Sequence, residues 1–301
     1  MEEQKIKQYF LKIIKEEEDV SIGVAAIRTL LEIIRQSKSE TVQELELILK
    51  DAINIMKNLN IPVAGITSGC ELFLRFITLT TLDASLKEVR ARMLERGQMF
   101  LKKLNESRNK IVRIASDFIL DGSSILTHSR SRVVLQTLIE ASKQQRQFHV
   151  FVTISAPDDS GKHMHKDLEA AGIPCTIILD SAIGYIMEQV NFIMVGAESV
   201  VESGGIVNKV GSYTMAVCAK EMKKPFYVLT ESFKFTRLFP LNQTDLPAEY
   251  KYNSEKRKNI DLQKAHPLVD YTPPSYITLL FTDLGILTPS AISDELIKLY
   301  L

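Results

Sequence analysis

The first 115 residues carry apolar positions at helical spacing. One such stripe runs along a single face and consists of Leu45, Ile48, Leu49, Ala52, Ile53 and Met56. Only one of the ten prolines and four of the thirteen glycines lie in this part of the chain. Apolar residues three and four apart pack on one side of a helix. The pattern therefore predicts a helical bundle with helices near residues 4–16, 20–36, 41–58, 68–80 and 83–119, the last broken around residues 105–107.

Three sequence motifs mark predicted helix starts. A Ser or Thr followed three residues later by Glu occurs at Thr41, Ser68 and Ser85. In such a capping box, the hydroxyl and the carboxylate each accept a hydrogen bond from a backbone amide that the first helical turn leaves unpaired. The sequence therefore predicts that these three residues begin helices.

The period changes after Gly122. Short β-branched runs, SSILTH, FHVFVTIS, PCTIILD, NFIMVGA and KPFYVLTE, alternate with helical segments near residues 130–145, 161–171, 181–189 and 212–222. This alternation is typical of an α/β fold with a parallel sheet between helices. The sequence predicts a helical domain at 1–119 and a Rossmann-like domain at 120–301. Residues 240–275 read as a polar excursion, before one or two closing strands and a helix from about residue 289.

Composition narrows the possible partners. Hydrophobic residues make up 45% of the chain and charged residues 25%, which is ordinary for a globular protein. Lys plus Arg equals Asp plus Glu at 37 each, so no global positive field favours nucleic acid. No apolar run reaches the roughly 18 residues of a spanning helix, and no secretory signal is evident, so we expect no membrane and a cytosolic protein. The three cysteines are widely separated and are expected to be reduced core residues.

Residues 191–232 carry the most chemistry. The apolar run FIMVGA predicts a buried parallel strand that ends at Glu198, where an open α/β sheet presents groups to a ligand. Gly204 and Gly205 then allow a tight turn. The arrangement favours a pocket over an ordinary crossover with a polar loop.

A polar pair and a helix start complete this segment. Asn208 and Lys209 supply an amide and a flexible cation, and Gly211 precedes a helix for which Ser212 is the expected cap. The amino end of a helix suits an anion. The alternative reading is that Asn208 and Lys209 only brace the loop.

The ends of the predicted strands are expected to meet at one edge of the sheet, because ligands in open sheets lie outside the carboxyl ends. The residues at these ends are Thr127, His128, Ser155, Asp180, Glu198 and Glu231. Asp180 is more readily interpreted as the cap of the next helix than as a ligand-binding group. Arg130 and Arg132 follow the first strand and could meet an anion, although solvated arginines explain them as well.

Standard cofactor and metal signatures are absent. The segment SAPDDSGKHM contains Gly161 and Lys162 but lacks the first glycine and the final hydroxyl residue of a P-loop. No GxGxxG follows a predicted strand. His163 and His165 lie two residues apart and point to different sides of a helix. We therefore expect neither a cofactor nor a metal ion.

Several long blocks carry a resemblance to a known family. They are AAIRTLLE, SGCELFLRF, ILTHSRSRVVL, VGAESVVESGGIVNKVGSYTMAVCAK, PFYVLTESFKF and TDLGILTPSAISDELIKLYL. With them the chain resembles the alpha, beta and delta subunits of eukaryotic translation initiation factor two-B over nearly its whole length. Its compact length and the closing IKLYL favour the alpha members. The resemblance implies a helical N-terminal domain and a Rossmann-like C-terminal domain, as the residue pattern does independently.

The resemblance also implies a regulatory function. Factor two-B is the guanine-nucleotide exchange factor for initiation factor two, and exchange itself belongs to a different subunit. The implied partners are the beta, gamma, delta and epsilon subunits, the phosphorylated alpha subunit of factor two, and a second copy of this chain joined through its C-terminal domain. Thr41 and Glu44 are candidate residues for binding the phosphorylated partner. A solvated helix face is the simpler explanation for either residue alone.

Related sugar-phosphate isomerases provide the alternative. The resemblance implies that isomerases acting on ribose bisphosphate or methylthioribose phosphate share the NK(V/I)G segment, but have a cysteine and an aspartate where this chain has His128 and Glu198. Without the thiol, and with a longer acid that would be misplaced in a fitted site, we expect no catalytic residues. His and Glu remain capable acid–base groups, so an isomerase or a non-catalytic sugar-phosphate sensor stays the alternative function. The candidate ligand-binding residues are His128, Arg132, Glu198, Asn208 and Lys209.

Overall fold

The computed structural model describes residues 3–17, 20–59, 61, 63–78, 85–252 and 266–300. Its contacts divide the chain into two compact units. The first unit comprises Met1–Glu106, Ala248–Ala265 and Leu299–Leu301, and the second comprises Ser107–Pro247 and His266–Lys298.

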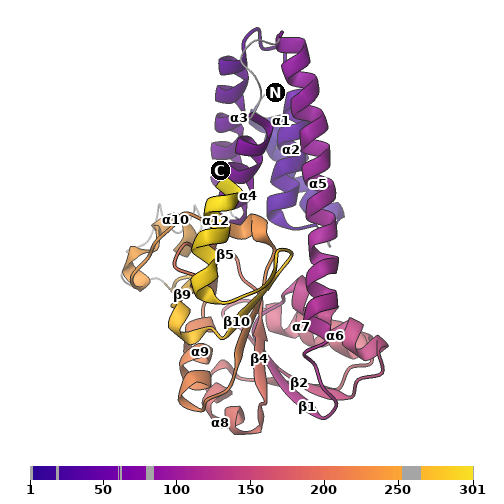
Figure 1. Ribbon diagram of the computed structural model, residues 1–301, viewed down its shortest axis with the longest axis vertical. Helices are drawn as coiled ribbons and strands as arrows, with labels where there is room; N and C mark the ends of the chain where they lie inside the picture. The colour runs from indigo at the N-terminus through magenta and orange to yellow at the C-terminus, as the bar shows by residue number, and fades with distance from the viewer. Residues whose placement is uncertain are drawn as a thin grey trace. The chain divides into compact units, whose positions relative to one another are not determined.

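The first unit is built from helices, as the sequence predicts. They are α1 (Glu3–Glu16), α2 (Ile22–Gln36), α3 (Val42–Lys57), α4 (Ala64–Thr78), the first two thirds of α5 (Leu86–Ser116) and the short α10 (Ala248–Lys251). Helix α2 packs against α1, α3 and α4, so the helices lie alongside one another (Figure 1). Fully buried side chains from four helices meet between them, among them Phe10, Ile27, Leu30, Leu45, Leu49 and Phe73. Burial of these apolar faces stabilises the bundle.

Two of the three predicted helix caps are confirmed. Thr41 accepts a hydrogen bond from the Glu44 amide at 3.1 Å and caps α3. Ser85 and Glu88 form a reciprocal capping box before α5, with bonds of 3.4 and 3.0 Å. The prediction for Ser68 was wrong, because α4 already begins at Ala64. Ser68 is buried inside that helix, where its hydroxyl donates to the carbonyl four residues earlier, at 3.1 Å.

The predicted break in the fifth helix was also wrong. Helix α5 continues without interruption through residues 105–107 to Ser116. Asn and Ser lower helix propensity by only a few tenths of a kcal/mol each. Buried Leu104 and Ile111 lie on either side of the predicted break, and their packing outweighs that small cost.

The second unit contains a seven-stranded sheet in the order β11-β10-β7-β4-β1-β2-β3. Its strands are β1 (Ser123–Thr127), β2 (Phe148–Thr153), β3 (Cys175–Ile178), β4 (Phe192–Val195), β7 (Phe226–Leu229), β10 (Leu279–Thr282) and β11 (Gly285–Leu287). All neighbouring strands are parallel except β10 and β11. The predicted α/β fold is confirmed, and five of these strands coincide with the five β-branched runs.

Helices cover both faces of this sheet (Figure 1). They are α6 (Arg132–Lys143), α7 (Ser160–Ala170), α8 (Ile183–Ile186) and α9 (Ser212–Glu221). Short 3₁₀ turns occur in the connections, at Asp180–Ala182, Met187–Gln189, Ser232–Lys234, Gln243–Asp245, Pro274–Tyr276 and Pro289–Ala291. Ile125, Val150 and Met194 belong to one apolar cluster with α6, α7 and the end of α5. Helix α9 contacts β4 and β7. Both faces of the parallel strands are therefore buried, which explains why the strand sequences read as continuous apolar runs.

A second, four-stranded sheet was missed by the sequence analysis. It consists of β5 (Ser199–Val201), β6 (Ile206–Lys209), β8 (Phe235–Thr236) and β9 (Val269–Thr272), in the order β8-β5-β6-β9. Strands β5 and β6 form a hairpin around the double glycine. Gly204 has φ +85°, and a Cβ on it would clash with the Pro289 carbonyl. Because the strands have two to four residues, their pattern cannot be distinguished from that of a loop.

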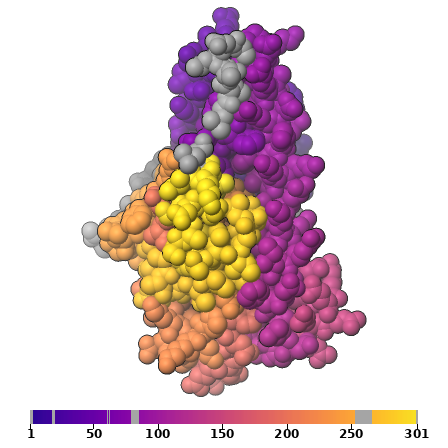
Figure 2. Space-filling model, viewed as in Figure 1, coloured from indigo at the N-terminus to yellow at the C-terminus, as the bar shows by residue number. Residues whose placement is uncertain are grey.

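The chain closes as expected, with two strands and helix α12 (Ile292–Tyr300) after the turn at Pro289. This C-terminal segment, yellow in Figure 2, forms a broad part of the face shown. Leu284, Ile286 and Ile297 are its large exposed apolar side chains, with 41%, 40% and 51% of their surface accessible. Among the residues that the structure describes, no helix is both long and apolar enough to cross a membrane.

Candidate functional site

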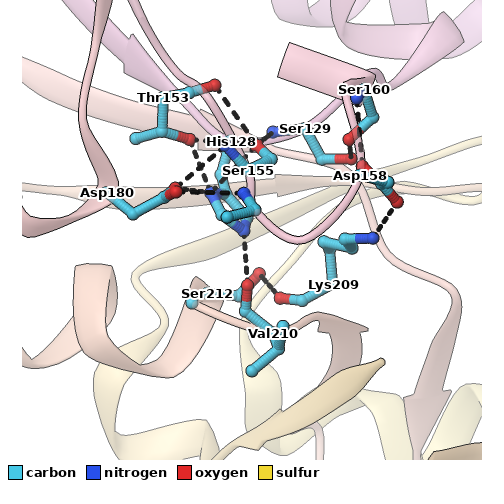
Figure 3. Close-up of polar contacts among 12 residues, drawn as sticks. His128, Ser129, Thr153, Ser155, Asp158, Ser160, Asp180, Lys209, Val210 and Ser212 are labelled. Atoms are coloured by element: carbon cyan, nitrogen blue, oxygen red, sulfur yellow. Dashed lines mark hydrogen bonds and ion pairs between the residues drawn. The ribbon is translucent and has the colours of Figure 1, made fainter. Parts of the chain in front are cut away.

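The carboxyl edge of the large sheet brings together side chains from distant parts of the chain (Figure 3). His128 follows β1, Ser155 follows β2, Asp180 follows β3, and Lys209 ends β6 of the small sheet. Two of the predicted ligand-binding residues, His128 and Lys209, thus lie near each other, because the His128 ring contacts the carbonyl of Val210, the residue after Lys209.

His128 is the buried centre of this group, with 1% of its surface exposed. Its Nε2 lies 2.8 Å from the Val210 carbonyl oxygen, and its Nδ1 lies 2.6 Å from the Thr153 hydroxyl. A carbonyl can only accept, so Nε2 carries the proton and Nδ1 accepts from Thr153 in the neutral ring. Burial lowers the pKa of His128, with a smaller opposing effect from the Val210 carbonyl. The imidazole is therefore neutral, and protein groups occupy both of its nitrogens.

Asp180 supports the loop after β2. Its two carboxylate oxygens accept hydrogen bonds from the amides of Ser155 and Ala156, both at 3.0 Å. One oxygen also lies 3.8 Å from Nδ1 of His128. The expectation that Asp180 caps the following helix was wrong: Leu179 occupies that position, and Asp180 is the first residue of the 3₁₀ turn. The carboxylate bonds instead to a neighbouring loop, because two free amides there point toward it.

Asn208 and Lys209 point to different sides of β6, since successive strand residues alternate. The Asn208 amide donates to the Ser212 hydroxyl at 2.9 Å, and that hydroxyl donates to the Lys209 carbonyl at 2.7 Å. The prediction that Ser212 caps α9 was wrong. Ser212 is the first residue of this helix, and Gly211 is its cap. The Lys209 ammonium forms an ion pair with Asp158 in the loop after β2. The structure therefore separates the amide from the cation that the sequence analysis grouped together.

Gly211 lies directly against the imidazole. It has φ +109°, and a Cβ built on it would approach within 2.8 Å of the His128 ring. A side chain at this position would be strained by the backbone and would also collide with the ring. The NKVG segment thus matters here for packing as well as for its polar groups.

Asp270 is an important residue that the sequence analysis missed. Its Oδ2 accepts hydrogen bonds from the amides of Gly211 and Tyr213, at 2.7 and 3.0 Å. The anion at the start of α9 is therefore the protein's own carboxylate. Burial raises the pKa of Asp270 to about 7, although the two amides favour its ionised form. It lies in VDYT, inside the stretch interpreted as a polar excursion, and this run of four residues is too short for its alternation to predict a strand.

The other candidates lie farther along the same edge. Arg132 is the first residue of α6, and Gly196 packs against neighbouring Ser131, which brings the start of α6 beside the end of β4. Glu198 is partly exposed just before β5, and its backbone amide donates to the Val207 carbonyl at 2.9 Å. The structure describes no direct bond from Glu198 to His128 or Lys209.

Glu231 takes part in an internal ion pair with two cations. It is buried between Arg108, at 3.5 Å, and Lys234, at 3.0 Å. Burial alone would raise its pKa, but the two cations outweigh burial and hold the pKa at about 2. Glu231 is therefore always ionised near neutral pH, which suits an internal ion pair rather than proton transfer.

Metal-ligating groups and a hollow elsewhere in the described residues bear on the choice of site. No group of three metal-ligating side chains is found among residues 3–17, 20–59, 63–78, 85–252 and 266–300. A hollow of about 540 Å³ lies at the opposite, amino edge of the sheet, where Ser123, Phe192 and Tyr227 help to line it. It lacks a cation and a histidine. The carboxyl edge remains the better candidate for ligand binding.

Comparison with known proteins identifies the family. The model of the initiation factor 2 subunit family matches residues 15–289. The chain belongs to this family. A translation initiation factor eIF2B subunit alpha from Dictyostelium discoideum is 45% identical over 305 residues, which cover 97% of this chain and 95% of that protein. The resemblance found in the sequence is thereby confirmed.

Several solved structures share the fold. A chain of the tetrameric eIF2B-beta2-delta2 complex from C. thermophilum superimposes with a TM-score of 0.78 and 20% identity, covering 100% of this chain and 96% of that chain. A 5-methylthioribose 1-phosphate isomerase from Pyrococcus horikoshii OT3 gives a TM-score of 0.68 and 22% identity, covering 98% and 87%. At these identities the likeness concerns the fold alone.

The raised pKa of Asp270 generates a testable pH dependence. An acid whose pKa is higher in the folded than in the unfolded chain contributes stability at low pH, and this stability is lost as pH rises through the folded value. Asp270 has a pKa of about 7 when folded and an ordinary value of 3.8. We therefore expect the free energy of unfolding of the wild type to fall by about 1–4 kcal/mol between pH 5 and pH 8, relative to that of Asp270→Asn.

Melting temperatures of both chains at pH 5 and pH 8 measure this difference. Asp283→Asn is the control, because Asp283 also accepts a backbone amide, from Ser232 at 2.7 Å, but belongs to another part of the sheet edge. Equal pH dependence in wild type and Asp270→Asn would contradict the assignment.

Proposed function

We propose that this chain is a regulatory subunit of the guanine-nucleotide exchange factor for translation initiation factor two. The observation that carries the proposal is the 45% identity to a eIF2B subunit alpha across nearly the full length of both chains. Its partners would then be the beta, gamma, delta and epsilon subunits. Exchange itself would belong to another subunit, as the family resemblance implies.

We further propose that two copies associate through the sheet domain and bridge halves of the larger complex. Strand β11 is an edge of the seven-stranded sheet, and Leu284 and Ile286 expose about 40% of their surface there. An apolar edge strand is a surface that proteins commonly cover. This observation supports a self-association surface.

Isolation from cells tests the subunit assignment. We expect an epitope-tagged chain to co-purify with four other exchange-factor subunits, and the purified chain alone to have the mass of a dimer by light scattering at micromolar concentration. Leu284→Glu together with Ile286→Glu should shift the mass toward that of the monomer. Recovery of the tagged chain without other subunits would contradict the proposal, and a monomeric wild type would contradict the dimer.

The start of α3 is the proposed contact for phosphorylated factor two. Thr41 and Glu44 are both exposed, and each already has a capping role. Thr41 accepts from the Glu44 amide, while the Glu44 carboxylate accepts from the Glu40 amide at 2.8 Å. A substitution that tests binding must therefore be separated from loss of the cap, which costs about 0.5–2 kcal/mol.

Two substitutions at Glu44 achieve this separation. We expect Glu44→Lys to make nucleotide exchange by the reconstituted complex less sensitive to phosphorylated factor two, because it reverses a surface charge. Glu44→Gln keeps an acceptor for the Glu40 amide and serves as the control for the cap. Nucleotide release measured across a titration of the phosphorylated partner gives the readout. Unchanged inhibition in a folded Glu44→Lys complex would remove this helix from the interface.

We also propose that the carboxyl edge binds a sugar phosphate without turning it over. Lys209 supplies the cation, and His128 positions the site instead of transferring protons, because both its nitrogens are engaged. Glu198, Asn208 and Arg132 remain proposed contacts for the ligand. None of the three cysteines lies at the carboxyl end of a strand: Cys70 and Cys218 are in helices, and Cys175 begins β3. The thiol expected of an isomerase is therefore missing.

A sugar-phosphate isomerase is the second candidate function, so the experiment measures both binding and turnover. We expect ribose 5-phosphate to raise the melting temperature of the wild type and Lys209→Ala to weaken binding about 10- to 100-fold, since it removes a charge-assisted bond. NMR of the mixture should show no isomer, because losing a general acid or base commonly costs on the order of 100- to 10,000-fold in rate. Rapid isomer formation would instead support the enzyme, and no binding would contradict the proposed site.

A further inference from the structure

The loop after β2 places a carboxylate on the proposed phosphate-binding cation. The side chain of Asp158 forms an ion pair with Lys209 through one oxygen, and its other oxygen accepts from the Ser160 amide at 3.0 Å (Figure 3). The Ser160 hydroxyl lies 2.9 Å from that of Ser129. The Lys209 ammonium and the Ser160 amide thus both contact this carboxylate, and the Ser160 hydroxyl pairs in turn with that of Ser129. These are the groups that ordinarily bind a phosphate.

We propose that Asp158 is an internal competitor for the phosphate group, so that a phosphate monoester binds by displacing this carboxylate from Lys209. The inference rests on the proposed sugar-phosphate site and adds to it the residue that sets its affinity and its selectivity for charge. A phosphate monoester near neutral pH carries about −1.5 to −2 charges and three acceptor oxygens, whereas the carboxylate carries one charge and two oxygens. Neutral sugars and monoanions lack this advantage in charge, so we expect that they do not displace Asp158 from Lys209.

The exposures of the two partners make such an exchange feasible. Only 14% of the Lys209 side chain is accessible, whereas 52% of the Asp158 side chain is accessible. A cation that has lost most of its water needs an anion beside it, so Lys209 favours exchange of one anion for another over an empty state. Released Asp158 can be solvated at once.

The surrounding loop limits the movement to a small region. The backbone amides of Ser155 and Ala156 are held by Asp180, and Ser160 begins α7. Burial alone would raise the pKa of Asp158, but its bonds to Lys209 and Ser160 outweigh burial and lower the pKa. The competitor is therefore charged at neutral pH, when a phosphate monoester would arrive.

The neighbouring residue provides a matched control. Asp159 carries the same charge one position farther along, but its side chain pairs with Lys162 on the surface at 2.7 Å and makes no capping bond. Asp158→Asn and Asp159→Asn change the net charge equally. Only the first removes the negative charge that faces Lys209. A difference between them therefore measures direct competition and not the general field of the protein.

Binding of ribose 5-phosphate and of inorganic phosphate to the full chain, measured by calorimetry, tests the inference. We expect Asp158→Asn to bind both probes about three- to tenfold more tightly than the wild type, and Asp159→Asn to match the wild type within about twofold. Free ribose should bind no better to either variant. Adding Lys209→Ala to Asp158→Asn should abolish the gain, because the two residues act through one interaction.

The outcomes separate this inference from the function on which it rests. Equal affinities in Asp158→Asn and Asp159→Asn, or weaker binding by Asp158→Asn, would overturn competition while leaving a Lys209-dependent site intact. Absence of binding by every chain would overturn the site itself, and the competitor with it. Asp158→Ser repeats the test with a shorter side chain, and melting temperatures verify that each variant is folded.

Discussion

The buried imidazole of His128 joins three segments that are far apart in sequence. It follows β1, accepts from Thr153 at the end of β2, and donates to the carbonyl of Val210 between β6 and α9. An unpaired polar atom at 1% exposure would cost about 1–3 kcal/mol, so each bond constrains the position of its partner. Gly211 must lack a side chain for the ring to fit. The placement of Lys209 at the carboxyl edge depends on this arrangement, because Lys209 precedes Val210 in the chain.

The backbone pattern of the large elements could be predicted from the sequence. The helical stripe around Leu45 and the β-branched run 148–155 are each long enough to show a period. The small sheet could not be predicted in the same way, because β5 and β8 have three and two residues and owe their strand conformation to pairing with distant partners. Ser68 illustrates the same limit: a local motif predicted a cap, but buried neighbours extended the helix past it.

The candidate site was predicted in its location and less well in its bonding. Strand ends converge in any parallel sheet, so the positions of His128 and Asp180 followed from topology. The hydrogen-bond and ion-pair partners in the site could not be predicted in this way. The sequence could not reveal that Asp270 occupies the start of α9 or that Asp158 reaches Lys209, since both contacts join residues more than 50 positions apart. Charge pairing of this kind depends on tertiary structure, whereas the periodicity of a sequence predicts only local secondary structure.

The buried acids illustrate how environment decides the role of a chemical group. Glu231 is surrounded by two cations and keeps a pKa of about 2, while Asp270 has only backbone amides and its pKa rises to about 7. The first is a fixed ion pair, and the second can change its charge near neutral pH. Lys209 differs from both acids, because its one carboxylate partner, Asp158, has about half of its side chain exposed to solvent. A pair with one buried and one exposed member is held less firmly than Glu231 with its two cations. Because the exposed member regains water when it leaves, exchange at this position is easier than at either buried acid.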